Sequence, residues 1–162
     1  MLIIPCSIII ASMKIAIGSD HAGFPLKEVL KEFMNKEGYE VIDVGVYEET
    51  SADYPIFAEK VVRLIQNGEA ERGVLICGTG IGMSISANKF KGIRASLCTN
   101  EYMARMSRRH NNSNVLCLGS RVVGVDLAIS ILKTWLEEEF EGGRHLRRLG
   151  IIEGWEGDKK SC

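Results

Sequence analysis

The sequence predicts a three-layer α/β domain with helices on both faces of a doubly wound parallel sheet. Three observations support this fold class. Five short apolar runs of strand length recur along the chain, and stretches with helical spacing of apolar residues separate them. The runs are apolar at successive positions, which is typical of parallel strands covered on both faces. A length of 162 residues suits one compact core and is too short for two ordinary domains.

The elements follow one another in a regular βα alternation. We expect five strands, at Lys14–Gly18, Glu40–Gly45, Gly73–Cys77, Ile93–Cys98 and Val115–Gly119. The expected helices are Pro25–Asn35, Pro55–Gln66, Met83–Phe90, Tyr102–Arg109 and Val125–Phe140. The first two of these helices begin with a proline, a residue that the first turn of a helix tolerates. The order is that of a Rossmann-like five-stranded sheet.

Residues 13–150 are expected to form the domain, with a C-terminal helical extension after the last core helix. Residues 1–12 are apolar but lack the basic leader of a secretory signal, so we interpret them as an N-terminal extension outside the core. Gly142-Gly143 break the chain and open a basic segment. Residues 151–162 are interpreted as a frayed polar C-terminal tail.

Composition restricts the classes of function. A net charge of −1 provides no global basic field, which argues against binding to nucleic acid or to an anionic membrane surface. Five cysteines form no C-x-x-C pair, which argues against both disulfides and a zinc site. No apolar run is long enough to span a bilayer, so we expect a cytoplasmic protein whose partners are small molecules or copies of itself.

The clearest chemical signal is the apolar strand that runs through Cys77 into three alternating glycines, Gly78, Gly80 and Gly82. Glycines leave backbone N–H groups accessible, and a following helix would add its positive N-terminal end, so this segment can bind an anion. A thiol beside it is expected to ionise more easily, although a cysteine that ends an apolar strand is more often inert packing. The glycine spacing matches neither the dinucleotide motif nor the phosphate loop of nucleotide hydrolases, which weakens a nucleotide-binding interpretation.

Ligands of doubly wound sheets bind at the carboxyl ends of the strands, near the point where strand order reverses. Segments Ser19–Gly23 and Glu48–Tyr54 are expected to meet the Cys77 loop at that edge. Asp20 and His21 would then share its pocket. Two basic segments lie later in the chain. The one that ends at His110 is interpreted as a helix C-terminus whose arginines face solvent or another subunit. The one from Arg144 to Arg148 fits surface charge as well as phosphate binding.

These motifs resemble the ribose-5-phosphate isomerase B family, in a group that includes galactose-6-phosphate and allose-6-phosphate isomerases. The resemblance runs from Met13 to about Gly150. Its motifs are Gly18-Ser-Asp-His-Ala-Gly23, Asp53-Tyr-Pro55, Ile76-Cys-Gly-Thr-Gly-Ile-Gly82, Asn88-Lys89, Gly92-Ile-Arg94, Arg109-His-Asn-Asn112, Gly119-Ser-Arg121 and Gly142-Gly-Arg-His145. It implies an aldose-ketose isomerase of the pentose phosphate pathway that acts through a cis-enediolate, without metal or organic cofactor.

The resemblance also implies roles for individual residues. Cys77 would be the base that removes the C2 proton, with Thr79 beside it, and His110 the acid that opens the sugar ring. The implied substrate-binding residues are Asp20, His21, Tyr54, Gly78, Thr79, Gly80, Ile81, Gly82, Asn111, Arg121, Arg144 and Arg148. One branch of the family has a glutamate base directly after the last loop glycine. This chain has Met83 there, so the role of base falls to Cys77.

Chain order predicts a shared site. His110 precedes the fifth strand, so it is expected at the opposite end of the sheet from Cys77, which ends the third. We therefore expect a homodimer or homotetramer in which a partner supplies His110 and some arginines. Two alternatives remain open at this point: an isomerase of a six-carbon sugar phosphate, and a non-catalytic sugar-phosphate-binding module.

Overall fold

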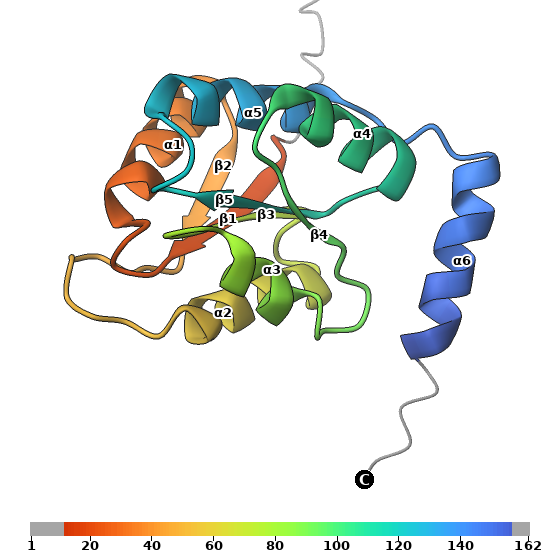
Figure 1. The fold of residues 1–162 in the computed structure, drawn as a ribbon, viewed down its shortest axis with the longest axis horizontal. Helices are drawn as coiled ribbons and strands as arrows, with labels where there is room; N and C mark the ends of the chain where they lie inside the picture. Colours follow the sequence, from red (N-terminus) through yellow and green to blue (C-terminus); the bar gives the residue numbers. More distant parts are fainter. Residues whose placement is uncertain (1–11, 157–162) are drawn as a thin grey trace, which may run out of the picture.

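The computed structural model describes residues 12–156, in which a five-stranded parallel sheet lies between two layers of helices (Figure 1). Its strands are β1 (Lys14–Ser19), β2 (Glu40–Asp43), β3 (Arg72–Cys77), β4 (Ala95–Leu97) and β5 (Val115–Gly119). Its helices are α1 (Phe24–Lys36), α2 (Tyr54–Gln66), α3 (Ile81–Ala87), α4 (Glu101–Asn111), α5 (Val125–Glu137) and α6 (Arg144–Glu156). The predicted fold class is confirmed.

Side chains alternate between the two faces of the sheet. In β1, Ile15 and Ile17 pack with α1, α4 and α5, whereas Ala16 packs with α2 and α3. The same alternation places Cys77 at the end of β3, on the face covered by α2 and α3. Because both faces are buried, the strands show no polar alternation in the sequence, as expected for a parallel sheet.

The strand order is β2-β1-β3-β5-β4, so the direction of chain progression reverses between β1 and β3. These two strands pair in parallel, with Ser19 opposite Ile76 at their carboxyl ends. The edge where the sequence places Asp20, His21 and the Cys77 loop is therefore the switch point of the sheet, where α/β folds bind ligands.

Several element ends differ from the prediction. Strand β2 ends at Asp43 rather than Gly45, and β4 spans Ala95–Leu97 rather than Ile93–Cys98. Helix α4 ends at Asn111 rather than Arg109.

Helix α3 begins at Ile81 and has seven residues, because Gly80 turns the chain at a φ of 79° directly before it. Helix α5 ends at Glu137 rather than Phe140, because Glu138 has extended backbone with a ψ of 140°. The Glu138 carboxylate pairs with Arg105 and Arg109 of α4, which holds the departing chain against that helix.

The interpretation of residues 151–162 as a frayed tail is wrong for residues 151–156, which continue α6. Ile151, Ile152 and Trp155 recur there at helical spacing, and Leu149 of the same helix is buried. Helix α6 stands to the side of the three layers, next to the end of α4 (Figure 1). The expected N-terminal extension, except for Ser12, and residues 157–162 lie outside the described residues. Within residues 12–156, no helix has the length and apolarity needed to cross a membrane.

Candidate active site

Cys77 is the last residue of β3 and is 5% exposed. Its Sγ accepts a hydrogen bond from the Gly80 N–H at 3.1 Å. A backbone donor at this distance is the kind of contact that stabilises negative charge on an acceptor atom. The thiol and the first turn of the glycine loop therefore form one local unit, built from residues that are neighbours in the chain.

The glycine loop fits closely against the end of β5. A Cβ added at Gly80 would lie 2.6 Å from Leu97 Cδ1 and 2.9 Å from the Leu118 carbonyl carbon. A Cβ added at Gly119 would lie 2.6 Å from the Thr79 carbonyl oxygen. Both glycines are thus required by close backbone approach, and the loop cannot be displaced outward without losing the Gly80 contact to the thiol.

Arg121 and Tyr54 flank the loop. The Arg121 N–H donates to the Gly78 carbonyl oxygen at 3.0 Å, and its side-chain Cδ lies 3.5 Å from the position of a Cβ at Gly78. The Tyr54 ring covers Gly82 so closely that a Cβ there would lie 2.7 Å from Cε2. The arginine brings a planar, multiply donating cation to the loop, as suits a phosphate or carboxylate.

Asp20 and His21 lie beside the loop, at the carboxyl end of β1. The Asp20 N–H donates to the Ile76 carbonyl oxygen at 3.2 Å, and its carboxylate accepts the Gly23 N–H at 2.9 Å. His21 Nδ1 accepts the Ala52 N–H at 3.2 Å, so in the neutral ring the proton lies on Nε2, which can donate to a ligand. The three segments predicted to meet at this edge do meet there.

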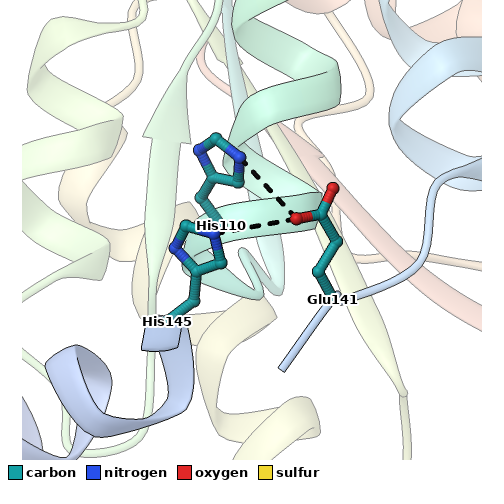
Figure 2. A group of neighbouring side chains, drawn as sticks. All are labelled: His110, Glu141 and His145. Carbon is teal, nitrogen blue, oxygen red and sulfur yellow. Dashed lines mark ion pairs between the residues drawn. The ribbon is translucent and has the colours of Figure 1, made fainter. Parts of the chain in front are cut away.

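The remaining predicted residues form a second group at the end of α4 and the start of α6. His110 stacks on His145, with ring centroids 4.1 Å apart and planes 12° apart. The Nε2 atoms of His110 and His145 face Glu141 Oε2 at 3.9 Å and 3.7 Å (Figure 2). Arg144 and Arg148 are exposed on the first two turns of α6.

Asn111 ends α4 and lines a cavity of about 440 Å³ between that helix, the β4 region and α6. Apolar side chains of α6 form the other side of this cavity, among them Leu149, Ile152 and Trp155. Asn111 therefore belongs with the His110 group rather than with the Cys77 loop.

The sheet separates the two groups within one chain. Gly73 and Cys77 of β3 pair with Val115 and Gly119 of β5, so the amino end of β5 lies four residues from the Cys77 edge. At about 3.3 Å per residue this is roughly 13 Å along the strand. His110 enters the fold from the amino end, as predicted from chain order, and the structure does not bring it to Cys77 of the same chain.

Burial lowers the pKa of His145 below its usual 6.5, and the positive charges of His110, Arg144 and Arg148 lower it further, against the raising effect of Glu141. The neutral imidazole is therefore favoured at this position. Sequence reasoning assigned no role to Glu141, and it placed His145 only in the basic segment that fits surface charge as well as phosphate binding. Their i, i+4 spacing was the available signal, but contact with His110 is set by the packing of α6 against α4.

Two other cysteines behave as small hydrophobic residues, as predicted. Cys98 and Cys117 are buried in the sheet region. Burial raises the pKa of Cys98 to about 11, although a hydrogen bond with Ser107 opposes the shift, and burial also raises the pKa of Cys117. Both remain neutral thiols at physiological pH.

The fold and the thiol-glycine loop define a doubly wound α/β protein whose candidate site lies at the switch point, where folds of this class bind ligands. A family model described as Ribose/Galactose Isomerase matches residues 15–152. The chain belongs to this family, and it is an isomerase.

Individual relatives agree with this assignment. The chain is 50% identical over 139 residues to ribose-5-phosphate isomerase B of Escherichia coli. The alignment covers 86% of this chain and 93% of the relative. The solved structure of Clostridium thermocellum ribose-5-phosphate isomerase B superposes with a TM-score of 0.90 at 56% identity, covering 91% of this chain and 100% of the other. A relative from Pectobacterium atrosepticum, named D-erythrulose-4-phosphate isomerase, is 41% identical over 150 residues, covering 91% of this chain and 98% of the relative.

Proposed function

We propose that this protein interconverts ribose 5-phosphate and ribulose 5-phosphate through a cis-enediolate, with Cys77 as the base and His110 as the acid that opens the furanose ring. The observation that carries the proposal is the hydrogen bond from the Gly80 N–H to Cys77 Sγ at the switch point of the sheet. It joins a potential base to the loop that would hold the developing negative charge. The choice of ribose 5-phosphate as the substrate rests on the names of the relatives.

The reaction moves one proton between neighbouring carbons. Cys77 thiolate would remove the proton from C2 of the open-chain aldose, which leaves negative charge on O1 of the enediolate. The proton is then returned to C1, while the O2 proton is transferred to O1, so that C1 carries a hydroxyl and C2 becomes the ketone carbon. Backbone N–H groups of Gly78–Gly82 and the Thr79 hydroxyl would donate hydrogen bonds to the oxyanion. A positioned base such as Cys77 contributes about 10²–10⁴-fold to the rate.

Phosphate and hydroxyl recognition would come from both residue groups. Arg121 and His21 lie at the loop edge, where Nε2 of His21 is available as a donor. Arg144 and Arg148 lie on α6 and would reach the phosphate of a site in a second copy of the chain, with Asn111 on a sugar hydroxyl. Asp20 would hold substrate hydroxyls beside the loop.

A homodimer with shared sites accounts for the separation of the two groups. Helix α6 carries four large apolar side chains that are exposed in the single chain: Leu146, Ile151, Ile152 and Trp155. Ile152 and Trp155 line the cavity together with Asn111, and exposed apolar side chains beside a cavity favour burial against another protein surface. The partner copy would place its His110 opposite Cys77.

The role of Cys77 is tested by the substitution Cys77→Ser, which keeps the shape and removes the sulfur base. We expect kcat for ribose 5-phosphate to fall by about 10²–10⁴-fold with the melting temperature nearly unchanged. The matched control is Cys98→Ala, which removes a buried thiol away from the loop and should keep kcat per folded molecule. Undiminished turnover by Cys77→Ser would refute the mechanism, and faster turnover of allose or galactose 6-phosphate by the unaltered protein would refute the choice of sugar.

Ring opening can be separated from proton transfer by choice of substrate. Erythrose 4-phosphate has its C4 oxygen esterified and cannot close a furanose ring, and one relative is named for the corresponding four-carbon ketose. We expect His110→Ala to lose turnover of ribose 5-phosphate by at least tenfold more than turnover of erythrose 4-phosphate. Equal losses with the two substrates would assign His110 to a step other than ring opening.

A further inference from the structure

Three side chains of the kinds that bind transition metals meet at the junction of α4 and α6, on the opposite side of the molecule from the Cys77 loop. His110, Glu141 and His145 each offer one ligand atom, and these atoms all lie within 4.8 Å of one another. Figure 2 shows both imidazoles directed toward the Glu141 carboxylate. Two imidazole nitrogens with one carboxylate oxygen form a ligand set that zinc and related cations accept.

His145 provides an independent indication that something binds here. Its side chain is 95% buried, at 5% exposure, and its Nε2 has no hydrogen-bond partner among the described residues. That nitrogen lies 3.7 Å from Glu141 Oε2, beyond hydrogen-bond distance. A buried polar atom without a partner is costly, and a cation between these two atoms would satisfy it.

The backbone fixes the cluster. The Glu141 N–H donates to the Arg109 carbonyl oxygen at 3.0 Å, which ties the segment before α6 to the last turn of α4. The His145 N–H donates to the Gly142 carbonyl oxygen at 3.1 Å. The three ligands are therefore held together by main-chain contacts as well as by the stacking of the two rings.

We propose that His110, Glu141 and His145 bind a divalent transition-metal cation such as Zn²⁺, and that the bound cation inhibits the isomerase by occupying His110. The second half of this inference rests on the proposed function, whereas the binding site itself does not. Water would complete the coordination of the cation, as at sites with three protein ligands.

The geometry requires only small movements. Tetrahedral zinc with bonds of about 2.0–2.1 Å places its ligand atoms roughly 3.3 Å apart. Glu141 and His110 are partly exposed and can close the remaining distance, with the His110 ring tilting out of its stack on the buried His145. Arg144 and Arg148 oppose a cation, while Arg109 is paired with Glu138, so we expect weaker affinity than at a structural zinc site.

Calorimetric titration of the chelator-treated, full-length protein with ZnCl₂ tests the site. We expect Glu141→Gln and His145→Gln each to weaken the binding of Zn²⁺ by at least about tenfold. His21→Gln is the matched control, because it removes the third histidine of the chain and leaves the cluster intact. Unchanged affinity in both cluster variants, or an equal loss in the control, would overturn the site.

Cobalt distinguishes the cluster from the cysteines. Co²⁺ bound to nitrogen and oxygen ligands gives only weak visible bands, so we expect no thiolate-to-cobalt charge-transfer absorption in the near ultraviolet. Strong absorption of that kind would place the cation on a thiol and contradict the proposal. The measurement needs no enzymatic activity, and it still decides the site if the protein does not isomerise ribose 5-phosphate.

Inhibition is measured separately. Turnover of ribose 5-phosphate should fall in proportion to Zn²⁺ occupancy and return on addition of chelator, and Glu141→Gln should need at least about tenfold more Zn²⁺ for the same fractional inhibition. Binding at the cluster without loss of turnover would leave the metal site standing. It would overturn inhibition through His110.

Discussion

At the scale of single residues, Gly80 joins the fold to the chemistry. Its φ of 79° lies in the left-handed region, and its Cα position leaves no space for a Cβ beside Leu97 and Leu118. The same residue donates its N–H to Cys77 Sγ. Any side chain here would therefore strain the backbone, disturb the end of β5 and displace the donor from the sulfur.

The substitution Gly80→Ala should lower both stability and activity. A positive φ costs about 1–2 kcal/mol for alanine, and the contact with Leu118 brings the expected loss in free energy of unfolding to roughly 3 kcal/mol. Gly92→Ala is the matched control, because Gly92 has a φ of 76° and nothing within 4 Å of its Cβ position. Denaturant unfolding and kcat are the measurements, and equal effects of the two variants would contradict the importance of the close contact.

At the scale of elements, a buried ion network ties α1 to β2 beside the Tyr47 ring. Lys27 of α1 is fully buried, and its Nζ donates to Asp43 of β2 at 2.6 Å and to Glu28 at 2.7 Å. Partial burial alone would raise the pKa of Asp43, but hydrogen bonds from Lys27, Lys31 and Gly45 outweigh it and hold that pKa below its usual 3.8. Ionised Asp43 therefore stabilises the folded state.

This network predicts how stability changes with pH. Because the pKa of Asp43 is lower in the folded than in the unfolded protein, its contribution is complete at neutral pH and is lost as the pH falls through the folded pKa. Asp43→Asn should lower the free energy of unfolding at pH 7 by about 2–3 kcal/mol, because it leaves buried Lys27 with one fewer anion. The difference in free energy of unfolding between Asp43→Asn and the unaltered protein should become smaller below about pH 4, because Asp43 is then protonated.

Glu40→Gln is the control for this prediction, because Glu40 lies on the same strand but forms an exposed pair with Lys14 at 3.8 Å. Exposed pairs contribute little, so Glu40→Gln should change stability much less than Asp43→Asn at every pH. If the Asp43→Asn difference stayed constant from pH 7 to pH 3, the carboxylate charge would not be its source.

At the scale of the whole molecule, the parallel sheet places the Cys77 loop and the His110 group at opposite ends of the strands. Register alone establishes this, since Val115 pairs with Gly73 while Gly119 pairs with Cys77. In the proposed homodimer, the exposed apolar side chains of α6 would lie against the second copy. A two-fold pair would complete two equivalent sites.

Complementation tests the shared site. Cys77→Ala and His110→Ala should each be inactive alone. When the two variants are co-expressed and pair at random, about half of the dimers contain one chain of each variant. Each of these mixed dimers has one site with both residues intact and one site with neither. The activity should therefore reach about a quarter of that of the unaltered protein. Activity no higher than that of either variant alone would show that one chain supplies both residues.

The amino-acid sequence was enough to predict the βα order, the Cys77-glycine loop and the convergence of Asp20 and His21 on that loop, because these depend on local periodicity and on the fixed direction of parallel strands. The extension of α6 to Glu156 and the contact of Glu141 and His145 with His110 became visible in the folded chain alone. Those contacts depend on how one helix packs against another across a turn at Gly142-Gly143. No spacing in the chain encodes that angle, since a glycine pair permits many directions and side-chain packing selects one.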